Sequence, residues 1–248
     1  MSEPIGYQDL VNLRKTCRVC EGFEYRNQSV LGYDTGEIGN FTTWANDLNA
    51  DLMIVAQDFS NQKIYLRDQG CIEPKSLIEG AVATNYSTAT NFYLRELTRH
   101  IGRDIGLPTG NVSRGIFLTN AVLCMKSGAM NDANPSACVK NCGTLFLSRL
   151  IGMIKPKVIV TLGVVPAMSV LDIHLAATPL LGSLRRSTFG DVFTKSPIQL
   201  NDAGLLLFPM YHPGRLGQLN RKRVEQSALS GLDLMKADWQ RMRMSLGW

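Results

Sequence analysis

Four runs of consecutive apolar residues recur along the chain, and each is closed by a polar residue, a glycine or a proline. They are DLMIVAQD (51–58), GIFLTNAVLC (115–124), KVIVTLG (157–163) and GLLLFPMYHP (204–213). Short aliphatic and β-branched runs of this kind predict strands that are buried on both faces, as in a parallel sheet.

Segments with the apolar spacing of helices separate these runs. The two clearest are NFYLRELTRHIGRDIG, from Asn91, and SACVKNCGTLFLSRLIGMIK, from Ser136. A further amphipathic helix is predicted over about residues 222–245. Alternating strands and helices predict an α/β fold. We expect one domain, residues 1–248, with a three-layer αβα sandwich around a central, mainly parallel, four-stranded sheet.

Composition narrows the class of protein only a little. Hydrophobic residues make up 45% of the 248 residues, which is enough for a full core. Lys and Arg outnumber Asp and Glu by 26 to 21, a modest excess that agrees with an anionic partner but equally with a solvated basic helix. No run reaches the about 18 to 20 apolar residues of a membrane span, and the N-terminus lacks a leader pattern, so we expect a cytoplasmic protein without membrane contact.

Polar side chains follow the predicted strands. Because ligand sites in open parallel sheets lie beyond the carboxyl ends of the strands, these residues are candidates for chemistry. They are Gln57 and Asp58, Asn120 and Cys124, Gly163, and the Tyr211-His212-Pro213 turn. An acid, an amide and an imidazole from three strands would therefore share one edge of the sheet.

The six cysteines are unlikely to form structural disulfides in a reducing compartment. Cys17 and Cys20 form a C-x2-C pair, which can present two thiolates to one metal centre. Cys124 with Cys138 or Cys142 could complete a four-thiolate site. The competing interpretation is that Cys71, Cys124 and Cys138 are simply buried small side chains. Zinc and an iron-sulfur cluster cannot be told apart by cysteine count.

Five stretches, in order, resemble the uracil-DNA glycosylase superfamily, most closely its iron-sulfur branch, family 4. They are TCRVC, LMIVAQD, IFLTNAVLCMKSG, NCGTLFLSRLIGMIKPKVIVTLG and FPMYHPGRL, between Thr16 and Leu216. The resemblance implies a 4Fe-4S cluster, with zinc as the less favoured metal. Its ligands would be Cys17, Cys20, Cys124 and Cys142, because the spacing to the following proline favours Cys142 over Cys138.

Two motifs depart from that branch. The first motif of the branch is usually Gly-Glu-Ala-Pro-Gly, whereas Ala56-Gln57-Asp58-Phe59-Ser60 has the Gln-Asp of the first family. The last motif is usually His-Pro-Ser, and here a glycine, Gly214, follows the proline, so that no serine hydroxyl can contact a phosphate.

The resemblance also implies roles for individual residues. Asp58 would position water or stabilise the sugar cation, and His212 would stabilise the leaving base. An ordinary turn residue and a structural histidine are the competing interpretations. The base would be bound by Gln57, Phe59, Ser60 and Asn120, with Phe59, Tyr65 or Tyr86 stacking on it. DNA would be contacted by Gly214, Arg215, Leu216 and Arg221, with Lys222 and Arg223 as further basic candidates and Leu216 as the wedge.

These residues predict a monomeric DNA-repair glycosylase that acts on uracil, with hypoxanthine and xanthine as further candidate bases. Two alternatives belong to other classes. One is a catalytically silent member of the fold that binds nucleic acid or a partner protein. The other is a zinc-bound hydrolase acting on nucleotides.

Overall fold

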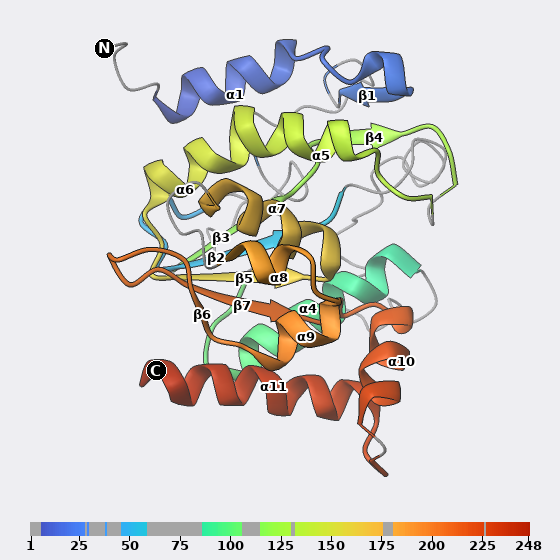
Figure 1. The fold of residues 1–248 in the computed structure, drawn as a ribbon, viewed down its shortest axis with the longest axis vertical. Helices are drawn as coiled ribbons and strands as arrows, with labels where there is room; N and C mark the ends of the chain where they lie inside the picture. Colours follow the sequence, from blue (N-terminus) through green and yellow to red (C-terminus); the bar gives the residue numbers. More distant parts are fainter. Residues whose placement is uncertain are drawn as a thin grey trace.

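The core is built around a five-stranded sheet, shown at the centre of the computed structural model (Figure 1). The structure describes residues 6–27, 29, 38, 46–58, 86–105, 115–129, 132–175, 181–225 and 227–248. The strand order is β3-β2-β5-β7-β6. Its strands are β2 (Leu52–Ala56), β3 (Ile116–Asn120), β5 (Val158–Leu162), β6 (Ile198–Gln199) and β7 (Leu206–Met210).

Strands β3, β2, β5 and β7 are parallel to one another, and β6 joins the edge antiparallel to β7. Every residue of β2, β3 and β5 is buried, because helices cover both faces of the sheet. The predicted αβα sandwich is therefore confirmed, and β6 adds an antiparallel edge strand to the four predicted strands.

Helices form a layer on each side of the sheet (Figure 1). One layer contains α4 (Tyr86–His100) and α11 (Gly231–Leu246), whose Leu94 and Trp239 belong to the same hydrophobic cluster as Leu52 and Ile54 of β2. The other layer contains α5 (Ser136–Cys142), the π-helical turn η4 (Gly143–Leu147), α6 (Ser148–Ile154) and α7 (Val164–His174). The short helices are α8 (Leu181–Arg185), α9 (Phe189–Thr194) and α10 (Arg215–Val224).

The helical run Ser136–Ile154 meets the length and hydropathy of a possible membrane span, which the sequence analysis did not expect. Its apolar side chains pack inside the protein, where Phe146, Leu150 and Ile154 belong to the hydrophobic core on this face of the sheet. We therefore interpret this run as a core helix.

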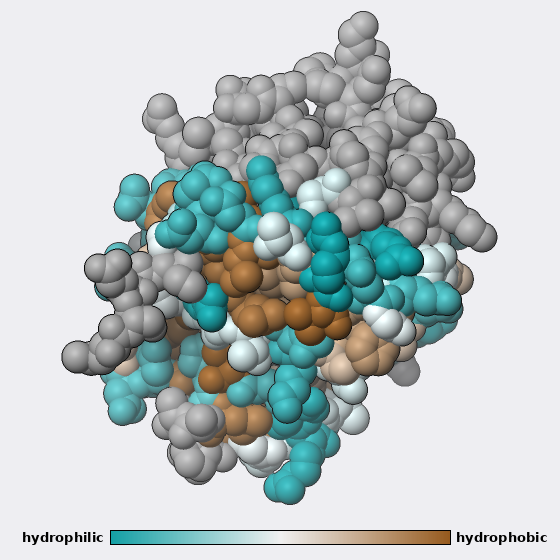
Figure 2. Space-filling model, turned by 90° about the horizontal axis from the view of Figure 1, so that it is seen from above, coloured by the Kyte–Doolittle hydropathy of each residue, from teal (hydrophilic) through white to brown (hydrophobic). Residues whose placement is uncertain are grey.

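An N-terminal layer lies outside the second helix layer and carries the cysteine pair. It consists of α1 (Tyr7–Thr16), the turn η1 (Glu21–Phe23) and β1 (Tyr25–Asn27), which pairs antiparallel with β4 (Cys124–Lys126). Figure 2 looks onto the molecule from this side, and hydrophobic residues reach the surface near the centre of the face.

Two predicted elements are divided in the structure. The run 115–124 is not one strand: β3 ends at Asn120, and Cys124 begins β4 in a different sheet. The C-terminal pattern is not one helix from residue 222, because residues 222–224 complete α10 and α11 begins at Gly231. Ser230 caps α11 by accepting a hydrogen bond from the amide of Asp233 at 3.1 Å, which fixes the new start.

Candidate active site

The carboxyl edge of the sheet gathers polar side chains from three strands. Asp58 follows β2, Asn120 ends β3 and His212 follows β7. Ala56 and Asn120 are register partners, and pairing continues beyond them because the Ala121 amide donates to the carbonyl oxygen of Ala56 at 2.8 Å. The strand-end residues singled out in the sequence therefore lie along one edge of the sheet.

One oxygen of the Asp58 carboxylate, Oδ2, accepts hydrogen bonds from three side chains. The donors are Lys126 Nζ at 3.3 Å, Asn134 Nδ2 at 2.8 Å and Gln57 Nε2 at 3.2 Å. The side chains of Asp58 and Lys126 are only 11% and 3% exposed. Water screens such a pair weakly, so the ammonium group stabilises the charged carboxylate more than an exposed lysine would.

Gln57, predicted to contact the base, directs its amide at Asp58 in this structure. Lys126 and Asn134 were not among the predicted site residues. In the sequence, Asn134 precedes a proline, a pattern that predicts only the start of a helix. Lys126 lies in the short strand β4, which the hydrophobic pattern did not distinguish from the apolar run before it. A lysine just after an apolar run was the one available signal, because a buried ammonium group requires a partner.

His212 is held as a neutral imidazole with its ring proton on Nε2. The amide N–H of Gly214 donates to Nδ1 at 3.1 Å, so Nδ1 is an acceptor and the ring proton is on Nε2. Burial lowers the pKa of His212 from its usual 6.5, and the negative charge of Asp58 offsets part of that decrease. The two residues therefore interact electrostatically across the edge of the sheet, and Nε2 is a donor at neutral pH.

Asn120 is almost completely buried, with 2% of its surface exposed. Its amide carries both a donor and an acceptor, which suits recognition of a base edge. Of the other base-binding candidates, Phe59, Ser60 and Tyr65 lie outside the described residues, as does the side chain of Tyr86. The structure therefore does not place a stacking aromatic ring.

Helix α10 starts directly after the histidine turn and exposes apolar and basic side chains. Leu216 is 60% exposed and Leu219 is 46% exposed, and Arg215 is exposed as well. A Cβ atom added at Gly217 would lie 1.9 Å from the carbonyl oxygen of His212, so the helix can approach the turn this closely only with glycine there.

Arg221, predicted to contact DNA, is turned into the protein and is 3% exposed. Its Nε donates to Asp238 Oδ2 at 2.6 Å and its Nη2 to Glu225 Oε2 at 2.7 Å. The prediction fails because α10 packs against α11 along this side of the helix, where the guanidinium neutralises a buried carboxylate. Arg215 and Leu216 remain on the exposed side.

The family model of the uracil DNA glycosylase superfamily matches residues 46–242, most of the chain. The protein belongs to the uracil DNA glycosylase superfamily. A search of curated proteins returned no match. Membership supports a glycosylase-like action on DNA in general. The matched segment contains the whole central sheet of this glycosylase fold and its polar edge, whereas α1, Cys17, Cys20 and β1 precede it.

Five cysteines of this superfamily member come together between the N-terminal layer and α5. Cys20, Cys124, Cys138 and Cys142 are buried and Cys17 is partly exposed, and none of them is in a disulfide. Burial, followed by the proximity of Cys142, Cys17 and Cys20, raises the pKa of the Cys124 thiol well above its usual range. Burial likewise raises the pKa of Cys142 to about 12.

These thiols fit a soft metal centre in their chemistry, since thiolate is the preferred ligand of zinc and of iron-sulfur clusters. Their geometry differs from that of a formed metal site. Within the described residues no group of three or more metal-ligating side chains has the geometry to hold a metal ion as it stands. The side chains of Cys20 and Cys138 interact with each other, so Cys138 lies as part of the same thiol cluster as the four predicted ligands.

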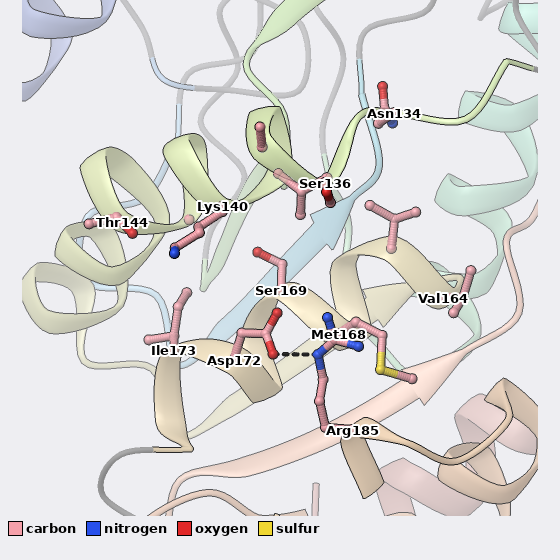
Figure 3. Close-up of a pocket in the computed structure, with 14 residues that line it drawn as sticks. Asn134, Ser136, Lys140, Thr144, Val164, Met168, Ser169, Asp172, Ile173 and Arg185 are labelled. Atoms are coloured by element: carbon pink, nitrogen blue, oxygen red, sulfur yellow. Dashed lines mark hydrogen bonds and ion pairs between the residues drawn. The ribbon is translucent and has the colours of Figure 1, made fainter. Parts of the chain in front are cut away.

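A groove of about 860 Å³ lies between α5 with η4 on one side and α7 with Arg185 of α8 on the other (Figure 3). The Asp172–Arg185 ion pair lies on the α7–α8 side of the groove, and Lys140 lines the opposite side. Asp58, Asn120 and His212 are not among the residues that line it, although Asn134 lines the groove and also contacts Asp58. The candidate active site of this glycosylase fold is therefore the sheet edge beside the groove.

Proposed function

We propose that this protein hydrolyses the N-glycosidic bond of uracil, and of related deaminated bases, in DNA. One observation carries the proposal: a carboxylate and a neutral imidazole, from different strands, interact at the ligand-binding edge of a uracil DNA glycosylase fold. Breaking a C–N glycosidic bond leaves positive charge on the sugar and negative charge on the base. The site offers one group suited to each charge.

Asp58 would act on the sugar side of the bond. Its carboxylate is held by three donors and paired with Lys126, so its charge and orientation are already set before the substrate binds. It would stabilise the developing cation at C1′ and orient the water that attacks this carbon. The water proton then leaves to solvent or to the departing base, which completes the hydrolysis.

His212 would act on the base side. Because Nδ1 accepts the Gly214 amide, only Nε2 can donate to the developing negative charge on a uracil carbonyl. A neutral donor can stabilise this charge without transferring its proton. Asn120, at the end of the neighbouring strand, would match the N3–H and O4 edge of uracil and reject cytosine, whose donor and acceptor are exchanged.

DNA would lie along the exposed start of α10. Leu216 would fill the space left by the extruded nucleotide, and the Gly214 and Arg215 region would meet the phosphates. Extrusion costs a few kcal/mol, and an apolar wedge offsets part of it by stacking in the gap. A monomer suffices for this arrangement, because every proposed group comes from one chain.

We further propose that Cys17, Cys20, Cys124 and Cys142 hold a 4Fe-4S cluster with a structural role. The proximity and burial of these thiols support it. Purified protein should absorb broadly near 400 nm and contain iron. Cys142→Ser should lose the iron, and Cys138→Ser, the matched control, should retain it. The reverse pattern would assign the fourth ligand to Cys138, and a colourless protein with stoichiometric zinc would refute the cluster.

The activity is tested with single- and double-stranded oligonucleotides that carry uracil, hypoxanthine or xanthine, followed by alkaline cleavage of abasic sites. We expect cleavage at uracil, with the other two bases defining the range of the pocket. DNA that is bound but cleaved at none of the three bases would refute the enzyme and favour the catalytically silent alternative.

A further inference from the structure

We propose that Lys126 and Asn134 are positioning residues that fix the orientation of the Asp58 carboxylate, and that Tyr25 connects them to the N-terminal layer. This inference rests on the proposed function, since it concerns how Asp58 acts in the same reaction. None of these three residues was among the candidates at the ends of the predicted strands.

The burial of Lys126 requires its ammonium group to have hydrogen-bond acceptors, and Asp58 is one of them. The lysine side chain is 3% exposed, and a buried ammonium group is stable only when its hydrogen bonds are satisfied. The ammonium group donates to Asp58 Oδ2 at 3.3 Å and to the carbonyl oxygen of Asp132 at 2.8 Å. The second contact holds the ammonium group in place independently of Asp58. The position of the ammonium group therefore restricts the orientation of the carboxylate.

Asn134 is fixed at both ends of its amide. Its Nδ2 donates to Asp58 Oδ2 at 2.8 Å, while its Oδ1 accepts the hydroxyl of Tyr25. The amide cannot turn around without losing both bonds, because the donor and the acceptor would exchange places. The donation from the Tyr25 hydroxyl to Oδ1 therefore fixes which end of the amide faces Asp58.

Tyr25 and Lys126 are register partners in the β1–β4 ribbon. One two-stranded ribbon therefore supplies a direct contact to Asp58 and, through Asn134, an indirect one. Cys124 lies in the same strand as Lys126, two residues earlier. Tyr25 precedes the segment that matches the family model, so the N-terminal layer contributes to the site from outside that segment.

Three donors on Oδ2 restrict the rotation of the carboxylate plane, which decides where its other oxygen is directed. Misplacing a reacting group by about 1 Å can cost about 10²-fold in rate without weakening substrate binding. Loss of Lys126 or Asn134 should therefore lower the rate of the bond-breaking step and leave the affinity for DNA nearly unchanged.

Single-turnover excision of uracil from a single-stranded oligonucleotide tests this, with the rate constant and the half-saturating protein concentration measured separately. Lys126→Met and Asn134→Ala should each lower the rate constant by about 10- to 10²-fold, with half-saturation within about twofold of the unmodified protein. Tyr25→Phe, which removes only the hydroxyl, should show a smaller loss of the same kind. Lys157→Met, the same change at an exposed residue by the opposite edge of the sheet, should have no effect.

Each change is repeated in an Asp58→Asn background. If Lys126 and Asn134 act through Asp58, they should cause little further loss there. An unchanged rate constant in Lys126→Met and Asn134→Ala, or an equal loss in both backgrounds, would overturn the inference while leaving the proposed function intact. An unmodified protein that excises no base would refute the proposed function first, and the inference with it. Unchanged iron content and circular dichroism of the variants control for folding.

Discussion

Asp58 and His212 present a charged acceptor and a neutral donor in one site, for reasons that can be traced to their contacts. Asp58 accepts hydrogen bonds on Oδ2 from a buried ammonium group and from two side-chain amides. His212 is partly buried and accepts a backbone amide hydrogen bond on Nδ1, and its desolvation favours the neutral form. At this scale the protein separates the two charges that a glycosidic cleavage creates.

The neutral state of His212 can be measured directly. We expect its imidazole to titrate below 6.5 in the DNA-free protein, because desolvation penalises the cation more than Asp58 favours it. An NMR pH titration of the three histidines, with His212 assigned by its absence in His212→Gln, gives the midpoint. A midpoint above neutral pH would mean that the imidazolium dominates there and would contradict the neutral-donor role.

At the scale of elements, the position of α10 depends on one missing side chain. Gly217 lets the helix contact the backbone of the histidine turn, and a Cβ atom there would overlap the His212 carbonyl group, an obstacle that no side-chain rotation can remove. The same helix carries Leu216 on its exposed side. The spacing between helix and turn therefore affects both the base-side donor and the proposed wedge.

Gly217→Ala should destabilise the protein by about 1–3 kcal/mol, the usual range for overpacking, and should reduce excision by displacing His212. Gly152→Ala is the matched control, because α6 leaves open space around that position and alanine favours helix. Urea denaturation should show the loss only at Gly217. Equal stabilities of the two variants would show that α10 shifts freely without cost.

At the scale of the whole molecule, basic residues divide into structural and surface groups. Arg221 neutralises Asp238 inside the α10–α11 contact, whereas Arg215 is exposed beside the sheet edge. Net charge alone, +5, does not distinguish these roles. Burial and ion-pair partners do.

Arg221→Met should therefore lower the free energy of unfolding by about 3 kcal/mol, since it leaves a buried carboxylate with one cation fewer. Arg215→Ala should leave stability unchanged but weaken DNA binding and reduce the salt dependence of binding by about one ion. Denaturation curves and binding titrations at several salt concentrations separate the two effects. A loss of DNA affinity without a loss of stability in Arg221→Met would restore Arg221 to the DNA interface.

Sequence patterns predicted the strands and their polar ends well, because strands buried on both faces leave continuous apolar runs and the sheet edge follows from parallel order. They did not predict the features that depend on tertiary packing. The break after Asn120 depends on β4 pairing with β1, almost a hundred residues earlier in the chain. The contacts of Lys126 and Asn134 with Asp58 likewise join residues that are distant in the chain, and Arg221 is buried by the packing of α10 on α11, neither of which local periodicity encodes.

Asp58 and His212 are the two groups proposed to cleave the glycosidic bond of uracil in DNA. The most direct measurement is single-turnover excision of uracil by the unmodified protein and by Asp58→Asn, with DNA affinity measured in parallel. The unmodified protein should excise uracil, Asp58→Asn should be slower by about 10²- to 10⁴-fold, and the two proteins should bind DNA with nearly equal affinity. An Asp58→Asn variant that excises uracil at the unmodified rate would show that Asp58 takes no part in the reaction.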